Sequence, residues 1–316
     1  MKKFLLIFLT STVVFISCKD KEEKSDKTLS VTEKKQEEYN VLLKDTIIYH
    51  KDFPSEYVDS RNVEVWLPTG YTANPSEKFK ILYMHDGQNV FDQTTAYGNV
   101  KWGIDETMDS LVENNLVPPT IVVAIWNNGR KRFPEYMPQV AEDHVNNPQA
   151  QTLLKQSFGV TELLSNNYLE FIVEELKPFI DSTYNTSTLR EDTAIMGSSM
   201  GGLISLYALT TFPEIFGAAG CISTHWPVPL IGDVYIKELT HTLPEAGNHK
   251  IYFDYGTSGL DSDYEPYQLR VDEIMKEKGY NKDKDWITRK FEGEGHNEAS
   301  WKRRVHLPLE FLLNSN

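Results

Sequence analysis

The feature that most constrains this chain is a glycine-flanked turn, Gly197-Ser198-Ser199-Met200-Gly201, between two apolar segments. The run 192–196 before the turn is typical of a strand buried on both faces. The segment 203–211 after it is too densely apolar for a helix with a polar face, which favours a helix packed under a sheet. A sharp strand-to-helix turn holds the central side chain clear of the backbone, and glycines at the flanking positions relieve the crowding. The pattern predicts Ser199 as a nucleophile, and a purely structural turn is the alternative.

The first eighteen residues have a different character from the rest of the chain. Lys2 and Lys3 precede an apolar run over residues 4–16, which ends at Ser17 and Cys18. The run reads as a secretory signal that is too short to span a bilayer. A small residue directly before a cysteine resembles a bacterial lipoprotein signal. We therefore expect residues 1–17 to be a signal peptide and Cys18 to be the lipidated first residue, with an ordinary signal peptide as the alternative.

A charged segment follows the signal. Residues 18–40 are dominated by Lys, Glu and Asp, with almost nothing apolar, which is typical of a disordered tether. The remaining residues, 41–316, show no repeat and no change of composition, and their length suits one domain. The predicted location is the bacterial cell envelope, with the chain held there by its lipid.

Charge and cysteine content exclude several partners. The formal net charge of −14 argues against a nucleic-acid partner and against electrostatic docking to anionic lipid. The expected membrane contact is therefore only the lipid anchor at Cys18. The second cysteine, Cys221, lies among small apolar residues and is expected to be buried and unpaired. The oligomeric state is left open.

Apolar runs alternate with helix-length segments along residues 41–316, the pattern of a mostly parallel sheet with helices on both faces. The fold class predicted is α/β, in a single domain. Strands are expected at residues 63–67, 79–84, 120–125, 192–196, 217–222, 250–253 and 287–291. Helices are expected at residues 103–114, 166–180, 201–211, 266–279 and 300–313.

A serine nucleophile needs a base, and in this sheet architecture the histidine follows the acid in the chain. His296 lies in a polar, glycine-bearing loop directly after the run 287–291. The carboxyl ends of parallel strands are where open α/β sheets keep their ligand sites. Because His306 falls in the last helix, and His241 and His249 lie in a polar connection with no preceding strand, His296 is the predicted base.

The segment after the run 250–253 offers the acid. Asp254 is so close to the strand that a structural hydrogen-bonding role is more natural for it. Asp261 lies in a loop with glycines behind it and a helix ahead, so it is the first choice, with Asp263 as the runner-up. The alternative is that these carboxylates only cap the following helix.

Attack of a serine on a carbonyl group also needs N–H donors, two in this architecture, to stabilise the negative charge that develops on the carbonyl oxygen. One follows the nucleophile directly and belongs to Met200. The other is expected in the loop after the third strand, and we assign it to Gln88. His85, in the same loop, is expected to brace the loop and not to react.

Five motifs are spread over the predicted domain: residues 83–89 (YMHDGQN), 132–138 (RFPEYMP), 197–202 (GSSMGG), 212–217 (FPEIFG) and 295–298 (GHNE). Together they resemble the Putative esterase or esterase D family of α/β-hydrolases, which implies an α/β-hydrolase fold. The resemblance covers roughly residues 60–313 and implies a Ser199–His296–Asp261 triad with no cofactor and no metal. The family's second oxyanion donor carries over to Gln88 by position, although Asp86 replaces a glycine common in related esterases.

The resemblance implies a serine ester hydrolase that forms an acyl-enzyme. The family includes feruloyl and acetylxylan esterases and enterobactin-type siderophore esterases. The expected substrate is a small-molecule or oligosaccharide ester, with feruloyl or acetyl decorations of polysaccharides favoured over a ferric siderophore. Alternatives from other classes are a non-catalytic carbohydrate-binding lipoprotein and a serine peptidase.

Two loops expected beside the elbow carry the candidate substrate contacts. Trp126 and Trp226 are candidates to stack on a sugar or an aromatic acyl group. Arg130 and Arg132 are candidates to meet a carboxylate or catecholate. The alternatives are that the tryptophans fill loops and that Arg132 pairs with Glu135.

Overall fold

A computed structural model describes residues 45–71, 76–141, 162–228 and 232–314, with a few isolated positions between 148 and 159. The expected signal peptide 1–17, tether 18–40 and lipidation site Cys18 lie outside the described residues. All that follows concerns the compact unit Tyr39–Asn316. Within its described part, no helix has the length and apolar character needed to cross a bilayer.

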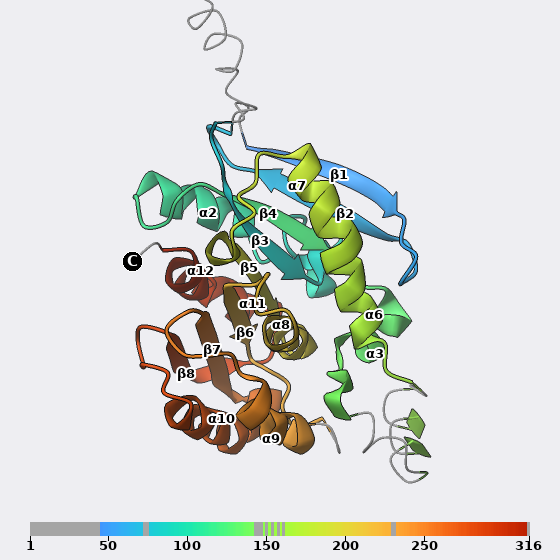
Figure 1. Cartoon of the computed structure of the whole chain (residues 1–316), viewed down its shortest axis with the longest axis vertical. Coiled ribbons are helices and arrows are strands. Elements are labelled where there is room, and N and C mark those ends of the chain that lie inside the picture. Colours follow the sequence, from blue (N-terminus) through green and yellow to red (C-terminus); the bar gives the residue numbers. More distant parts are fainter. Residues whose placement is uncertain are drawn as a thin grey trace, which may run out of the picture. The chain divides into compact units, whose positions relative to one another are not determined.

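One eight-stranded sheet forms the centre of this unit, with the strand order β1-β2-β4-β3-β5-β6-β7-β8 (Figure 1). The first two strands run antiparallel to their neighbours, and β3 to β8 are parallel. This confirms the predicted α/β-hydrolase fold with a mostly parallel sheet. The strands are β1 (Thr46–Phe53), β2 (Arg61–Leu67), β3 (Lys80–His85), β4 (Thr120–Ile125), β5 (Thr193–Ser198), β6 (Ala218–Ile222), β7 (Lys250–Ser258) and β8 (Trp286–Gly295).

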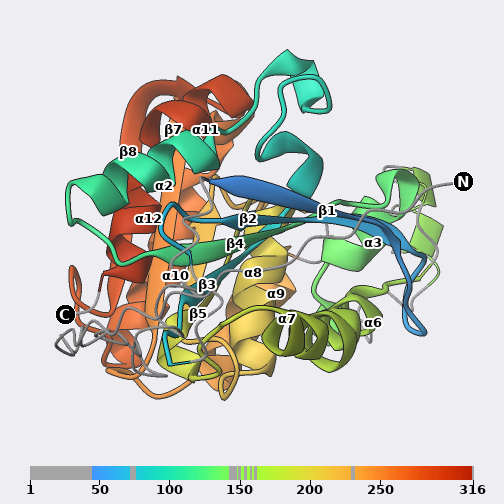
Figure 2. The same cartoon turned by 90° about the horizontal axis from the view of Figure 1, so that it is seen from above.

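Helices cover both faces of the sheet, and Figure 2 shows α2 on one side of the strands with α6 and α7 on the other. Short helices follow β3, β4 and β7 at the carboxyl edge: η1 (Gly87–Asn89), η3 (Gly129–Lys131) and η7 (Gly259–Asp263). The α-helices and the π-helical segment η5 are α2 (Ile104–Glu113), α3 (Arg132–Tyr136), α6 (Ser165–Glu170), η5 (Phe171–Leu176), α7 (Lys177–Thr183), α8 (Met200–Thr211), α9 (Gly232–Thr242), α10 (Glu265–Glu277), α11 (Glu298–Arg304) and α12 (His306–Leu313).

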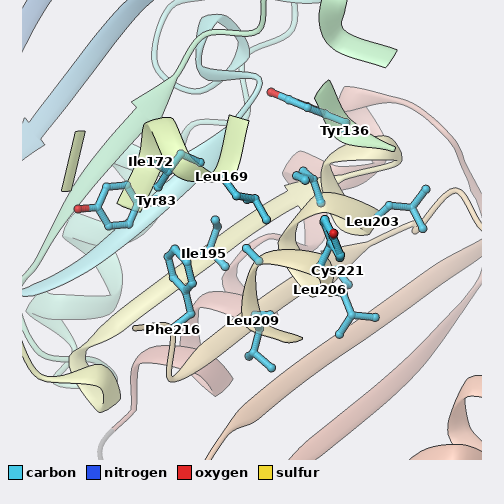
Figure 3. Packing of buried hydrophobic residues seen from close by; sticks show 14 of the residues in the cluster. Tyr83, Tyr136, Leu169, Ile172, Ile195, Leu203, Leu206, Leu209, Phe216 and Cys221 are labelled. Carbon is cyan, nitrogen blue, oxygen red and sulfur yellow. The ribbon is translucent and has the colours of Figure 1, made fainter. Parts of the chain in front are cut away.

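Buried side chains form two clusters, one on each face, because successive residues of a strand point to opposite sides. Along β3, Ile81 and Tyr83 belong to the cluster with α8 and η5. Leu82 and Met84 belong to the cluster with α2 and α12. Figure 3 shows the first cluster, in which side chains of α8 pack against β3, β5 and β6. The elbow that ends β5 is therefore held from both faces.

Several elements differ from the expected ones. Strand β1 and helix α9 were not predicted, and His241 lies in α9 instead of a polar connection. The last helix is divided at Val305, because Pro308 has no N–H with which to continue the hydrogen bonding of α11. The helix expected at residues 166–180 contains a π-helical turn, η5. Strand β7 continues to Ser258, beyond the predicted end at residue 253.

Candidate active site

Ser199 lies between β5 and α8 in a backbone conformation that non-glycine residues rarely adopt, with φ 60° and ψ −121°. The chain is crowded at this turn. A Cβ at Gly197 would lie 2.9 Å from the backbone of Gly201, and a Cβ at Gly202 would lie 2.8 Å from the Thr224 hydroxyl. The glycines therefore permit the tight turn that presents the Ser199 hydroxyl at the carboxyl edge of the sheet.

Three predicted side chains meet at this edge and form a hydrogen-bonded row. His296, at the end of β8, has its Nε2 atom 2.8 Å from Ser199 Oγ. Its Nδ1 atom lies 2.6 Å from Oδ1 of Asp261, which is in η7 directly after β7. Asp263, the runner-up, is exposed and hydrogen-bonds Ser262. The structure thus brings Asp261, and not Asp263, to the histidine.

The second carboxylate oxygen of Asp261 also has fixed partners. Its Oδ2 atom accepts hydrogen bonds from Ser223 Oγ and from the Gly256 N–H, both at 2.7 Å. Burial acts to raise the pKa of this carboxyl, but hydrogen bonds from His296, Ser223 and Gly256 outweigh burial and lower the pKa. Asp261 is therefore held as a carboxylate beside His296.

A buried hydrogen-bond network holds Asp261 in place through the Ser223 hydroxyl. The Ser223 hydroxyl, which donates to Asp261, accepts from Trp301 Nε1 at 3.0 Å and from Arg304 Nη2 at 2.9 Å. Arg304 also forms a salt bridge with Asp254 at 3.0 Å, which confirms the structural role predicted for Asp254. Sequence reasoning missed Ser223, Trp301 and Arg304 as members of this network, because the partners come from distant segments and no local spacing marks them.

Aromatic rings enclose the His296 imidazole. Trp301 packs edge-on with its ring centroid 5.0 Å away, and Tyr264 packs edge-on at 5.6 Å. His225, from the loop after β6, lies with its ring centroid 6.3 Å from that of His296. The rings restrict rotation of the imidazole, so its two nitrogens stay aligned with Ser199 and Asp261.

Of the two predicted oxyanion donors, Met200 directly follows Ser199, and Gln88 follows β3, which lies on the opposite side of β5 from β6, β7 and β8. Met200 is the first residue of α8, and the first N–H groups of a helix have no intrahelical acceptor. Gln88 is in η1, directly after β3. A Cβ at Gly201 would lie 3.5 Å from both His85 and Asp86, so the loop that carries Gln88 is adjacent to the helix N-terminus.

Buried polar residues fix the loop after β3. His85 hydrogen-bonds the Tyr168 hydroxyl at 2.8 Å, as its predicted bracing role requires, and burial lowers its pKa to about 3. A Cβ at Gly87 would lie 2.6 Å from the backbone of Ala124, so only glycine fits against β4 here. The backbone of this loop is therefore tied to its neighbours on two sides.

Asp86 is the third anchor of this loop. Arg132 holds its carboxylate with two hydrogen bonds of 2.7 Å, and Asn127 adds a third at 2.7 Å. Burial acts to raise the Asp86 pKa, but the Arg132 charge and these hydrogen bonds lower it. The alternative pairing of Arg132 with Glu135 is wrong, because Glu135 pairs with the buried Arg61 at 2.8 Å.

The candidate substrate contacts differ in accessibility. Trp226 is 1% exposed and donates its indole N–H to Gln268 at 2.9 Å, so stacking of Trp226 on a substrate is a wrong prediction in this structure. Trp126 is partly exposed, and its indole N–H donates to Glu64 at 3.1 Å. Arg130 is exposed, whereas the charge of Arg132 is committed to Asp86. Trp126 and Arg130 therefore remain as accessible candidates.

The described residues contain no group of three or more His, Cys, Asp or Glu side chains arranged to hold a metal ion. The chemistry that the site offers instead is a serine hydroxyl next to an imidazole, with a carboxylate behind the imidazole and a helix N-terminus in front of the hydroxyl. This arrangement suits attack on a carbonyl carbon and transfer of an acyl group.

Comparison with known proteins agrees with this chemistry. The model of the family described as Putative esterase matches residues 55–306. The uncharacterized protein YbbA of Bacillus subtilis (strain 168) is 23% identical over 264 residues, covering 81% of this chain and 94% of YbbA. The ferri-bacillibactin esterase BesA of the same organism is 26% identical over 201 residues, covering 61% of this chain and 64% of BesA.

A solved structure of a ferulic acid esterase has the same fold. It superposes with a TM-score of 0.59 at 18% identity and covers 86% of this chain and 99% of the esterase. The family match extends over most of the chain, including the elbow and the segment that carries His296. The chain therefore belongs to the Putative esterase family of α/β-hydrolases and is a carboxylic ester hydrolase.

Proposed function

We propose that Ser199, His296 and Asp261 carry out ester hydrolysis by two-step acyl transfer. The observation that carries the proposal is the continuous row of hydrogen bonds, 2.8 Å from Ser199 to His296 and 2.6 Å from His296 to Asp261. His296 removes the Ser199 proton during attack on the carbonyl carbon, and Asp261 stabilises the imidazolium. The same histidine protonates the departing alcohol and then activates the water that releases the acid.

The N–H groups of Met200 and Gln88 are the proposed donors to the oxyanion. Both belong to short segments held rigidly, one at the start of α8 and one in η1. Donors fixed before the reaction need no reorganisation as charge develops, and each contributes about 2.7–4 kcal/mol to transition-state stabilisation.

As the substrate we propose ester decorations of polysaccharides, feruloyl or acetyl groups. Trp126 packs edge-on against Tyr49, which is 47% exposed, and Asn127 donates its N–H to the Gln88 side chain at 3.2 Å. Exposed aromatic rings beside the oxyanion loop suit a sugar or an aromatic acyl group. Pairing of Arg132 with Asp86 leaves less positive charge for an anionic ligand.

A ferric siderophore ester is the second candidate. Its support is the similarity to BesA, whose name records activity on ferri-bacillibactin, and the exposed guanidinium of Arg130. Both candidates are consistent with a small-molecule or oligosaccharide ester as the binding partner.

For location, we propose a lipid anchor at Cys18 in a bacterial cell envelope. The support is the sequence pattern of an apolar run that ends at Ser17-Cys18. Metabolic labelling with a fatty acid should mark the full-length chain and not the Cys18→Ser variant; equal labelling of both would contradict the anchor.

Labelling with a fluorophosphonate tests the nucleophile. We expect one adduct on Ser199 and none in Ser199→Ala, and an unlabelled but folded wild-type protein would favour a non-catalytic binding role.

Hydrolysis of p-nitrophenyl acetate should exceed hydrolysis of a peptide amide, since the reverse would indicate a peptidase. Methyl ferulate, acetylated xylan and a triscatecholate lactone, compared side by side, separate the substrate candidates.

A further inference from the structure

His225 is a polar group at the site that the proposed chemistry does not use. It lies in the loop after β6, and its backbone N–H donates to the Ser199 carbonyl at 3.1 Å. Its ring lies beside that of His296 and is partly exposed. The backbone contact ties the position of His225 to that of the proposed nucleophile.

The hydrogen bonds of His225 define which of its nitrogens carries the proton. Its Nδ1 atom lies 2.6 Å from the Tyr264 hydroxyl, which is 3.4 Å from His296 Nδ1. Tyr264 is 0% exposed, so its hydroxyl proton needs an acceptor, and among the described residues its hydroxyl contacts only these two ring nitrogens. His296 Nδ1 donates to Asp261 and cannot accept, which leaves His225 Nδ1 as the acceptor. This assignment places the proton of the neutral His225 ring on Nε2.

This N–H group is open to a ligand. Among the described residues, Nε2 of His225 has no hydrogen-bond partner, and it is not one of the buried polar atoms that lack a partner. Burial, together with the charges of His296 and Arg132, lowers the His225 pKa to about 4. The ring is therefore neutral at neutral pH and acts as a donor without adding positive charge beside His296.

The strand order decides which part of an ester reaches His225. Gln88 follows β3, on one side of β5, whereas His225 and His296 follow β6 and β8, on the other. An oxyanion bound by the proposed donors Gln88 and Met200 would therefore lie toward β3, away from the His296 side of Ser199. The alcohol part must lie on the His296 side, because His296 gives it a proton as it leaves.

We propose that His225 Nε2–H binds an oxygen atom of the departing alcohol, so that the enzyme prefers esters of oxygen-rich alcohols, such as sugars, over esters of plain alcohols. This inference rests on the proposed acyl transfer at Ser199. It adds a specificity determinant for the leaving group, and it makes no statement about selection of the acyl group.

Two esters with one acyl group test this preference. A methyl acylxyloside and the corresponding cyclohexyl ester both have a six-membered ring and a secondary ester oxygen, and only the sugar offers further oxygens. The acyl group is acetyl or feruloyl, whichever the wild type hydrolyses faster. Both esters give the same acyl-enzyme, so the ratio of their kcat/KM values reports only on steps that involve the alcohol.

We expect His225→Phe to lower the sugar-to-cyclohexyl ratio about three- to tenfold, the effect of losing one neutral hydrogen bond. His225→Gln keeps an N–H donor and should restore part of the ratio. Tyr264→Phe no longer sets the His225 tautomer and should lower the ratio to a smaller extent. Melting temperatures and fluorophosphonate labelling show whether each variant is folded with a reactive Ser199.

An unchanged ratio in a folded and labelled His225→Phe variant would overturn the inference and leave acyl transfer intact. Equal kcat/KM values for the two esters in the wild type would overturn it as well. A wild-type protein that neither hydrolyses the esters nor takes the label would instead contradict the proposed function on which the inference rests.

Discussion

Two arginine–aspartate pairs hold the two sides of the site, and they differ in burial. On the acid side, which we define by His296, Asp261, Ser223, Arg304 and Asp254, the Arg304–Asp254 pair has side chains 4% and 0% exposed. On the oxyanion side, defined by the Gln88 loop with Asp86 and Arg132, the Arg132–Asp86 pair is 21% and 9% exposed.

The carboxyl groups of the two pairs respond differently to burial. Burial raises the pKa of Asp254 despite the charge of Arg304, whereas Arg132 lowers the pKa of Asp86 against the effect of burial. On the acid side, separating the buried Arg304–Asp254 pair is therefore expected to cost stability. On the oxyanion side, the Arg132–Asp86 pair is expected mainly to position the loop that carries Gln88.

The largest effect is expected at the centre of the acid side. Asp261→Asn keeps the shape of the side chain but favours the wrong imidazole tautomer, so kcat should fall about 10⁴-fold. Steady-state kinetics with p-nitrophenyl acetate measure the change, and the exposed neighbour variant Asp263→Asn is the matched control. A kcat within tenfold of wild type would remove Asp261 from the proposed triad.

Next in size is the loss of stability on breaking the buried pair. Arg304→Met leaves the Asp254 carboxylate buried without its partner, so the free energy of unfolding should fall by about 3–5 kcal/mol. Urea denaturation measures the change. The double variant Arg304→Met/Asp254→Leu has no unpaired charge and should recover much of the loss; if it is less stable than the single variant, burial of the pair is not the cause.

A smaller effect, mainly on activity, is expected on the oxyanion side. Arg132→Met releases the Asp86 clamp and loosens the loop that carries Gln88, so kcat should fall about 10- to 100-fold, below the cost of deleting a donor outright. Lys131→Met, at the next position on an exposed side chain, is the control. Equal kcat values for the two variants would show that the clamp does not position the loop.

The smallest effect concerns pH. The Asp86 pKa in the folded protein is below its ordinary value of 3.8. Between these two pKa values the unfolded state binds more protons than the folded state, so the free energy of unfolding falls as the pH falls through this range. Asp86→Asn should make this decrease with falling pH shallower.

The Asp254 pKa is raised, so its contribution to the pH dependence has the opposite sign. Asp254→Asn should therefore make the decrease in the free energy of unfolding with falling pH steeper.

Urea unfolding at several pH values between about 3 and 6 measures the slope of the free energy of unfolding against pH for each variant. One proton changes this slope by at most about 1.4 kcal/mol per pH unit. Slopes that change in the same direction in both variants would mean that the two pairs do not differ as described.

Sequence reasoning predicted the parts of the molecule that have a local signal. The parallel strands are continuous apolar runs, and the elbow is marked by its glycines, so the fold class and the position of Ser199 at a strand end were predictable. Strand β1 was missed because it alternates half-buried and exposed residues at the sheet edge. Helix α9 was missed because only one side of it is apolar and its polar residues resemble a loop.

The supports of the site have no such signal. Arg304 and Ser223 are 81 positions apart in the chain and form a hydrogen bond in the fold, and neither position has a distinctive neighbour pattern. The same holds for Arg132: Glu135, three positions later, suggested a local pair, and the fold places Asp86 beside Arg132 instead. Tertiary contacts of single polar side chains depend on topology, which residue spacing alone does not encode.

The backbone angles of Ser199 have a consequence for how this chain evolves. A non-glycine residue in such a sparsely populated conformation costs on the order of 1–3 kcal/mol, which glycine would largely avoid. Selection for a durable fold alone would therefore favour glycine at position 199. A serine retained there is a mark of selection for chemistry, and descendants freed from that selection are expected to lose the hydroxyl before they lose the fold.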